Sequence, residues 1–163
     1  MVAVSDTSAI SNLALIDRLD LLRVQFEKVW IPDAVKSELE GVPNRDARNS
    51  IEQASHDGWL GCRSAENTRL VTALTNELDR GEAEAIVLAT EIPADILLID
   101  EKDGRVLARQ FHLQVRGVLG ILIRAKATGA VPSLKSEIEA LRSRARFFVS
   151  AALEDEVLRT VGE

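Results

Sequence analysis

The first eight residues read Met1-Val-Ala-Val-Ser-Asp-Thr-Ser8 and combine a β-strand, an acid and a helix start in one short stretch. Val2 and Val4 favour a strand. Thr7 and Ser8 are residue types that cap helices, and an apolar helical repeat follows them. A strand that leads through an acid into a helix places that acid at the carboxyl end of the strand, where open α/β sheets build their sites. Asp6 is therefore the first candidate for a functional residue.

The same arrangement recurs later in the chain. Ile96-Leu-Leu-Ile99 is apolar at every position, as expected for a strand covered on both faces, and it leads directly into Asp100. Further strands are predicted at residues 28–31, 59–62 and 115–118, with helical patterns between them. Strands that alternate with helices indicate a mainly parallel sheet in a three-layer α/β/α sandwich. Asp6 and Asp100 should then lie at the same edge of that sheet.

Two further acids fall on apolar helix faces. Asp33 is expected to cap a helix on which Glu38 shares the buried face of Val35 and Leu39. Glu82 begins the helical run that follows Asp79-Arg-Gly, and it shares a face with small residues such as Ala85 and Ala89. An acid on a buried face needs a partner.

Composition indicates one domain over residues 1–163, with a helical segment at about 133–161 that packs on it or extends it. A single cysteine, Cys62, which is expected in the core, and two separated histidines make a structural zinc site unfavourable, so any metal would be held by oxygen. The net charge of −6 argues against coating of nucleic acid by bulk electrostatics. The apolar runs are strand-sized and no signal peptide is visible, so a cytoplasmic protein without membrane contact is expected.

Four carboxylates brought together without an intervening cation would repel one another, and burial would raise their pKa values. A divalent cation resolves this conflict. Mg²⁺ and Mn²⁺ prefer oxygen ligands and suit phosphate substrates. The set Asp6, Glu38, Glu82 and Asp100 therefore predicts a Mg²⁺ or Mn²⁺ site that serves phosphodiester hydrolysis.

Four segments carry a resemblance to the PIN domain, and in particular to the VapC-like toxins of prokaryotes. They are Val4-Ser-Asp-Thr-Ser8, the acid after Ile31-Pro32, Gly81-Glu-Ala-Glu-Ala-Ile-Val-Leu-Ala89 and Leu98-Ile-Asp-Glu-Lys-Asp-Gly104. The resemblance implies a five-stranded parallel sheet and a metal-dependent endoribonuclease. It also implies a toxin that forms a homodimer and is neutralised by a cognate antitoxin.

Matched by position, the resemblance makes Asp6, Glu38 and Asp100 site acids. Glu82 matches the acid of the central helix, although Glu84 competes for that role. Asp103 is expected as an outer or alternative ligand. Thr7 and Ser8 are expected to support the site by holding a water or a substrate phosphate.

Each acid also has a purely structural interpretation. Asp6 and Asp100 are common types at helix caps and turns, and Glu82 with Asp79 fits a capping box. Arg105 with Arg109, and the cluster of arginines at 142–146, are candidates for RNA phosphate contacts, but a solvated helix face is the more usual explanation.

Two other functions compete with the nuclease. A non-catalytic PIN-like binding module would keep the fold without the chemistry. A Mg²⁺-dependent phosphatase of the haloacid-dehalogenase type would need a second aspartate two residues after the first, where this chain has Ser8.

Overall fold

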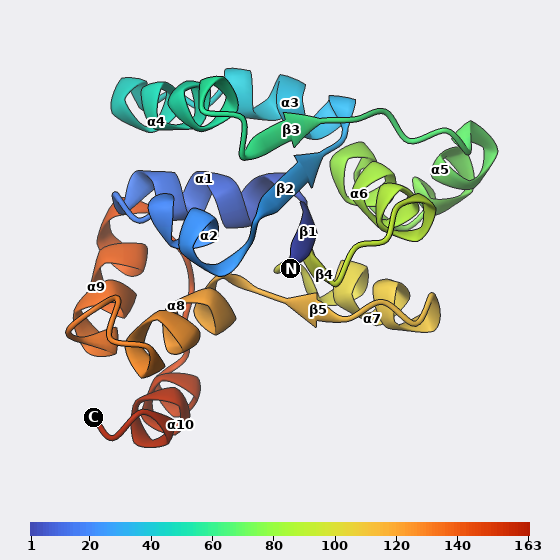
Figure 1. The fold of residues 1–163 in the computed structure, drawn as a ribbon. Helices are drawn as coiled ribbons and strands as arrows, with labels where there is room; N and C mark the ends of the chain where they lie inside the picture. Colours follow the sequence, from blue (N-terminus) through green and yellow to red (C-terminus); the bar gives the residue numbers. More distant parts are fainter.

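The structure, a computed structural model, describes residues 1–163 and contains five strands and ten helices (Figure 1). The strands are β1 (Val2–Ser5), β2 (Lys28–Ile31), β3 (Leu60–Cys62), β4 (Ile96–Leu98) and β5 (Val115–Arg116). The helices are α1 (Thr7–Leu15), α2 (Asp20–Gln25), α3 (Asp33–Glu40), α4 (Arg45–His56), α5 (Thr68–Leu74), α6 (Arg80–Glu91), α7 (Lys102–Gln110), α8 (Val118–Ala127), α9 (Leu134–Arg144) and α10 (Ala151–Thr160).

The five strands form one parallel sheet in the order β3-β2-β1-β4-β5. This confirms the predicted fold. β1 lies at the centre, where Val4 pairs with Trp30 of β2 and Ser5 pairs with Leu98 of β4. The chain leaves β1 toward β2 on one side and returns to β4 on the other. The order therefore reverses between β1 and β4, and such a point opens a crevice beyond the carboxyl ends of the two strands.

Each face of the sheet is covered by its own apolar core. Ala3 and Leu98 point into the larger core, which helices α1–α4 and α8–α10 contribute to. Val4 and Leu97 point the other way, into the core formed with α5, α6 and α7. Successive residues of one strand face opposite sides, which explains why the central strands are apolar at every position. Figure 1 shows the two groups of helices on either side of the strands.

The carboxyl-terminal helices α9 and α10 pack on the larger core. Leu134, Ile138 and Leu141 of α9 are buried there, together with Val157 of α10. Ser133 and Ser150 cap these two helices with their side chains, as their sequence positions predict. No helix combines the length and the apolar character needed to cross a membrane.

Several local expectations were wrong. Pro32 rather than Asp33 is the N-cap of α3, and the carboxylate of Asp33 accepts hydrogen bonds from Ser64 and Cys62 instead. Cys62 is exposed, because β3 is an edge strand with no neighbour beyond it. The predicted strand at 115–118 ends at Arg116, because Gly117 already caps α8.

Candidate metal centre

A cleft of about 250 Å³ opens at the carboxyl edge of the sheet, at the reversal point between β1 and β4. No hydrophobic side chain lines it, and neither Lys, Arg nor His does. Five of its eight lining residues are acids, and the other three carry hydroxyl groups: the lining consists of Asp6, Thr7, Ser8, Ser11, Glu38, Asp79, Glu82 and Glu101. The cleft therefore offers oxygen atoms only.

Asp6 is the most buried acid of the cleft, with only 3% of its surface exposed. Its amide donates to the carbonyl of Leu98, and its carboxylate caps α1 by accepting from Ala9 N at 3.4 Å. Asp6 therefore both caps α1 and lines the cleft. Burial raises the pKa of the Asp6 carboxyl to about 8, and the charge of Asp100 acts in the same direction.

Asp100 lies close to Asp6, and Ser8 contacts both carboxylates. The hydroxyl of Ser8 lies 3.2 Å from both carboxylate oxygens of Asp6 and 3.3 Å from Oδ2 of Asp100. The other oxygen of Asp100 accepts from Val118 N at 2.9 Å, at the start of α8. Burial raises the pKa of Asp100, although these hydrogen bonds oppose the shift. The ends of β1 and β4 thus place two aspartates side by side, as the sequence predicts.

Glu38 lies on the opposite wall and is not on a buried face as expected. Its side chain is exposed toward the cleft, where it accepts a hydrogen bond from the hydroxyl of Thr7. Val35 and Leu39 are the buried residues of α3, and Glu38 is exposed beside them. A Cβ atom at Gly81 would lie 2.8 Å from Oε1 of Glu38, so the missing side chain of Gly81 leaves room for this carboxylate.

Glu82 closes the cleft from α6 and forms the capping box that its spacing from Asp79 suggests. Its carboxylate accepts from Asp79 N at 3.2 Å, while Asp79 accepts from Glu82 N at 2.8 Å. Burial, followed by the charge of Asp79, raises the pKa of Glu82. Glu82 therefore takes part in the capping box of α6 and also lines the cleft.

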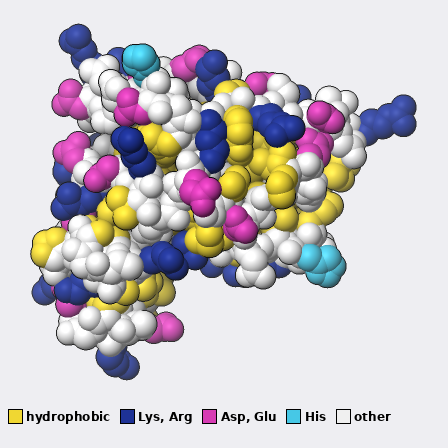
Figure 2. All heavy atoms as spheres, viewed as in Figure 1, with side chains coloured by type: hydrophobic (Ala, Val, Ile, Leu, Met, Phe, Trp, Pro, Cys, Tyr) yellow, Lys and Arg dark blue, Asp and Glu magenta, His cyan; other side chains and the backbone are white.

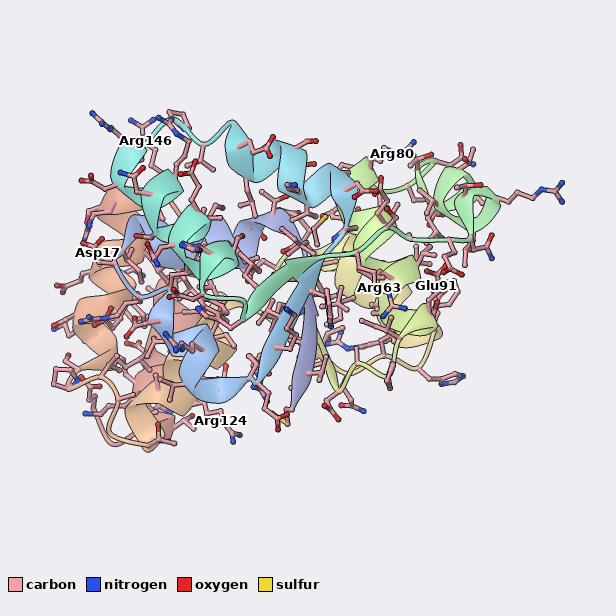
Figure 3. All side chains as sticks on the ribbon, turned by 45° about the horizontal axis from the view of Figure 1, so that its top comes forward. Asp17, Arg63, Arg80, Glu91, Arg124 and Arg146 are labelled. Atoms are coloured by element: carbon pink, nitrogen blue, oxygen red, sulfur yellow. The ribbon has the colours of Figure 1, made fainter.

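Glu84, the competing acid on α6, faces elsewhere. Its carboxylate accepts from Ala34 N at 3.2 Å and from Arg80 Nε at 2.8 Å, so it joins α6 to the start of α3. Figure 3 labels Arg80 at the beginning of α6, on the side toward α3. Glu84 does not line the cleft.

Asp103 also lies outside the cleft, in a separate hollow with Glu77 and Leu107. Its role as a ligand stays a prediction, and its position gives that role no support. Sequence reasoning did not propose Asp79, Glu101 or Ser11 as site residues, yet all three line the cleft. Glu101 directly follows Asp100 in the sequence, and this position could have marked it as a site residue. Ser11 could have been found from its position one helical turn after Ser8.

The donor chemistry of the cleft fits a hard divalent cation. Carboxylate and hydroxyl oxygens are the ligands that Mg²⁺ and Mn²⁺ prefer, and no basic side chain in the lining balances the acids. In this conformation no three of the acids are close enough together to hold an ion jointly. Glu38 and Glu82 instead bond to neighbours on their own walls. Asp6 and Asp100 form the pair that is already assembled.

The molecule is thus an α/β protein with a parallel sheet and an all-oxygen, acidic cleft at the reversal point, a donor set that suits a divalent metal ion. A family model for the PIN domain matches residues 2–163, and the chain belongs to that family. PIN domains are generally metal-dependent nucleases. The resemblance to PIN domains is thereby confirmed, while membership of the VapC-like subgroup stays a prediction.

The chain is similar in fold to a solved structure, a PilT N-terminus domain protein from the hyperthermophilic archaeon Sulfolobus solfataricus P2. The match has a TM-score of 0.50 and 20% sequence identity, and it covers 85% of this chain and 95% of that chain. No curated protein sequence matches the chain.

Proposed function

We propose that this protein is a Mg²⁺- or Mn²⁺-dependent endoribonuclease that hydrolyses phosphodiester bonds at the acidic cleft. The observation that carries the proposal is the pair of the buried Asp6 and the half-buried Asp100, linked by Ser8, where Asp6 and Ser8 line a cleft that has no basic side chain. Such a pair is unfavourable as two ionised groups unless a positive ion joins it. Membership of the PIN domain family supports the nuclease class.

Asp6 and Asp100 would hold the ion, and Glu38 and Glu82 would complete the site from the facing walls. A bound divalent ion supplies an activated water at neutral pH and neutralises charge on the phosphate oxygens. The remaining work falls to the protein. Ser8 fixes the orientation of both aspartates, and Thr7 holds the carboxylate of Glu38. Glu38 is exposed, so it can orient a water against the substrate phosphate.

A non-catalytic binding module is the second candidate, and one observation favours it. The acids of this conformation do not share a joint metal geometry, and Asp6 and Glu82 both serve as helix caps. Under this alternative, the protein would use the fold to bind a partner, and the acids of the cleft would serve only to cap helices.

The biological setting is a further part of the proposal. We infer that the protein acts in the cytoplasm as the toxin of a toxin–antitoxin pair, as a homodimer that a cognate antitoxin neutralises. This rests on the sequence resemblance to VapC-like proteins. A pull-down with the product of an adjacent reading frame, and light scattering of the purified protein, would test the two assembly statements.

The catalytic proposal is tested with a mixed pool of end-labelled single-stranded RNA. Wild-type protein should cut it with Mn²⁺ or Mg²⁺, and should stop when EDTA is added. Asp6→Asn should reduce cutting by about 100-fold or more, because the substituted amide is a poor metal ligand and carries no charge. Asp155→Asn, an exposed change on α10, is the matched control and should cut like wild type.

Cutting that persists in EDTA, or in a folded Asp6→Asn protein, would contradict the metal-dependent mechanism. A wild-type protein that binds RNA without cutting any member of the pool would support the binding module instead.

A further inference from the structure

One face of α7 carries basic side chains that have no partner in the protein. Arg105 and Arg109 are one helical turn apart and share a face of α7, and His112 follows just beyond the end of that helix. None of the three takes part in an ion pair. Five other arginines of the chain are paired with acids: Arg18, Arg23, Arg80, Arg142 and Arg144.

This face connects the cleft with a second hollow. Arg105 stands one helical turn after Glu101, which lines the acidic cleft. Arg109 and His112 line a hollow of about 450 Å³ together with Leu113, Gln114 and Val115, between α7 and β5. In Figure 1, α7 and β5 run side by side along the lower right of the molecule. The basic face therefore begins beside Asp100 and leads away from the cleft.

Arg105 is the member closest to the chemistry. Its Nε is buried and has no hydrogen-bond acceptor, which is uncommon for a charged group. Its positive charge reaches Asp100 and opposes the rise in the pKa of that carboxyl that burial causes, although the two form no ion pair. The terminal nitrogens of its guanidinium also donate no hydrogen bond within the protein, and the residue is only half-buried, so they are the atoms that an oxygen from outside can reach.

We propose that Arg105, Arg109 and His112 form a phosphate track that holds the RNA strand on one side of the cut. The inference rests on the proposed function, because it takes RNA as the polyanion. An acidic cleft in a chain of net charge −6 repels RNA, so cations must act close to the site. Figure 2 shows basic and acidic side chains interspersed on the viewed face rather than a broad basic surface, so a local row is needed. Along the axis of α7, Arg105 and Arg109 are about 6 Å apart.

The test measures binding separately from cleavage. Fluorescence anisotropy in EDTA reports the affinity of the full chain for a labelled single-stranded RNA at several salt concentrations. Arg105→Gln combined with Arg109→Gln should weaken binding roughly tenfold and reduce the slope of log K against log salt by about 1.4, since each phosphate contact on a single strand contributes about 0.7. The charge-retaining pair Arg105→Lys and Arg109→Lys should keep the wild-type slope.

The matched control removes two arginines elsewhere, by Arg146→Gln and Arg159→Gln. Both are exposed and unpaired, and Figure 3 labels Arg146 at the end of the molecule away from α7. A control pair that weakens binding as much as the α7 pair would overturn the track, because bulk charge would then explain the loss. An unchanged salt slope in the α7 pair would overturn it as well.

The outcome is separable from that of the nuclease proposal. A protein that cuts no RNA but loses affinity only in the α7 variant would retain the track and refute the catalysis. A protein that cuts in a metal-dependent way, with α7 and control variants equal in affinity and rate, would retain the nuclease and refute the track.

Discussion

The hydroxyl of Ser8 lies between the buried Asp6 and the half-buried Asp100 and has a single proton to donate. It can therefore satisfy only one of Asp6 and Asp100 when both are ionised. With the pKa of Asp6 at about 8, that carboxyl keeps its proton at neutral pH in the metal-free protein and can donate to Ser8, which in turn donates to Asp100. The proton on Asp6 removes the repulsion between two ionised carboxylates. Asp6 and Asp100 can therefore stay side by side without a bound metal ion.

Gly117 shows how closely Asp100 is packed. A Cβ atom there would lie 2.5 Å from Oδ1 of Asp100, so any side chain must displace the carboxylate. Gly117→Ala should leave the protein folded, because its φ of −97° suits alanine. Cleavage should fall by about 100-fold, the scale of loss that a 1 Å displacement of a catalytic group produces. Measured kcat with Mn²⁺ checks this.

Gly41→Ala is the matched control for that change. A Cβ atom at Gly41 would meet its nearest neighbour, the carbonyl oxygen of Glu38, at an ordinary 3.4 Å. Its rate should therefore stay close to wild type. Equal rates for Gly117→Ala and wild type would show that the position of Asp100 does not limit the reaction.

At the scale of elements, helix starts supply much of the cleft. Asp6 caps α1, Asp79 caps α6 and Glu101 is the N-cap of α7, and all three acids line the cleft. Acids are stabilising at the amino-terminal ends of helices because the aligned peptide dipoles place positive charge there. The helix ends therefore favour the acids that the proposed metal site needs.

Two variants distinguish the effect of the α6 cap on cleavage from the effect that losing any helix cap has on stability. Asp79→Ala removes the capping box and should lower the free energy of unfolding by about 1 kcal/mol. Ser150→Ala removes the cap of α10 and should lower it by a similar amount. Only Asp79→Ala should also slow RNA cleavage, because Glu82 loses the helix end that positions it. Equal rates in the two variants would contradict a site role for Glu82.

At the scale of the whole molecule, the acidic cleft makes stability depend on pH. The folded-state pKa of Asp6, about 8, lies above the 3.8 of an exposed aspartate, so the protonated form favours folding. Without metal, the contribution of Asp6 to the free energy of unfolding should be largest below about pH 4 and should be lost as the pH rises to about 8. Burial raises the pKa values of Glu82 and Asp100 too, so their effect has the same sign.

Urea unfolding in EDTA at several pH values measures this slope. Asp6→Asn should remove much of it and should be more stable than wild type near pH 8 by at least about 2 kcal/mol. Excess Mn²⁺ should restore the stability of wild type and not of the variant, by about 2.7 kcal/mol at a hundredfold excess over Kd. Parallel pH curves for the two metal-free proteins would mean that Asp6 is not the group responsible.

Local patterns were enough to predict most of the fold. Apolar runs located the strands, and Ser133 and Ser150 marked helix starts, because strand burial and capping depend on neighbouring residues. Asp6 and Asp100 were predicted to meet because the carboxyl ends of parallel strands share an edge. What depended on distant contacts was missed: the exposure of Cys62 follows from the edge position of β3, and Glu38 turns toward a cleft that α1 and α6 complete.

The central position of β1 has a consequence during protein synthesis. Its neighbour β4 comes much later in the chain, and Ser8 is separated from its contact Asp100 by 92 positions. A nascent chain that has emerged only as far as α6 has the first aspartate but not the second. Because the two aspartates leave the ribosome at different times, the growing polypeptide lacks the proposed metal pair while that part of its own messenger is being translated.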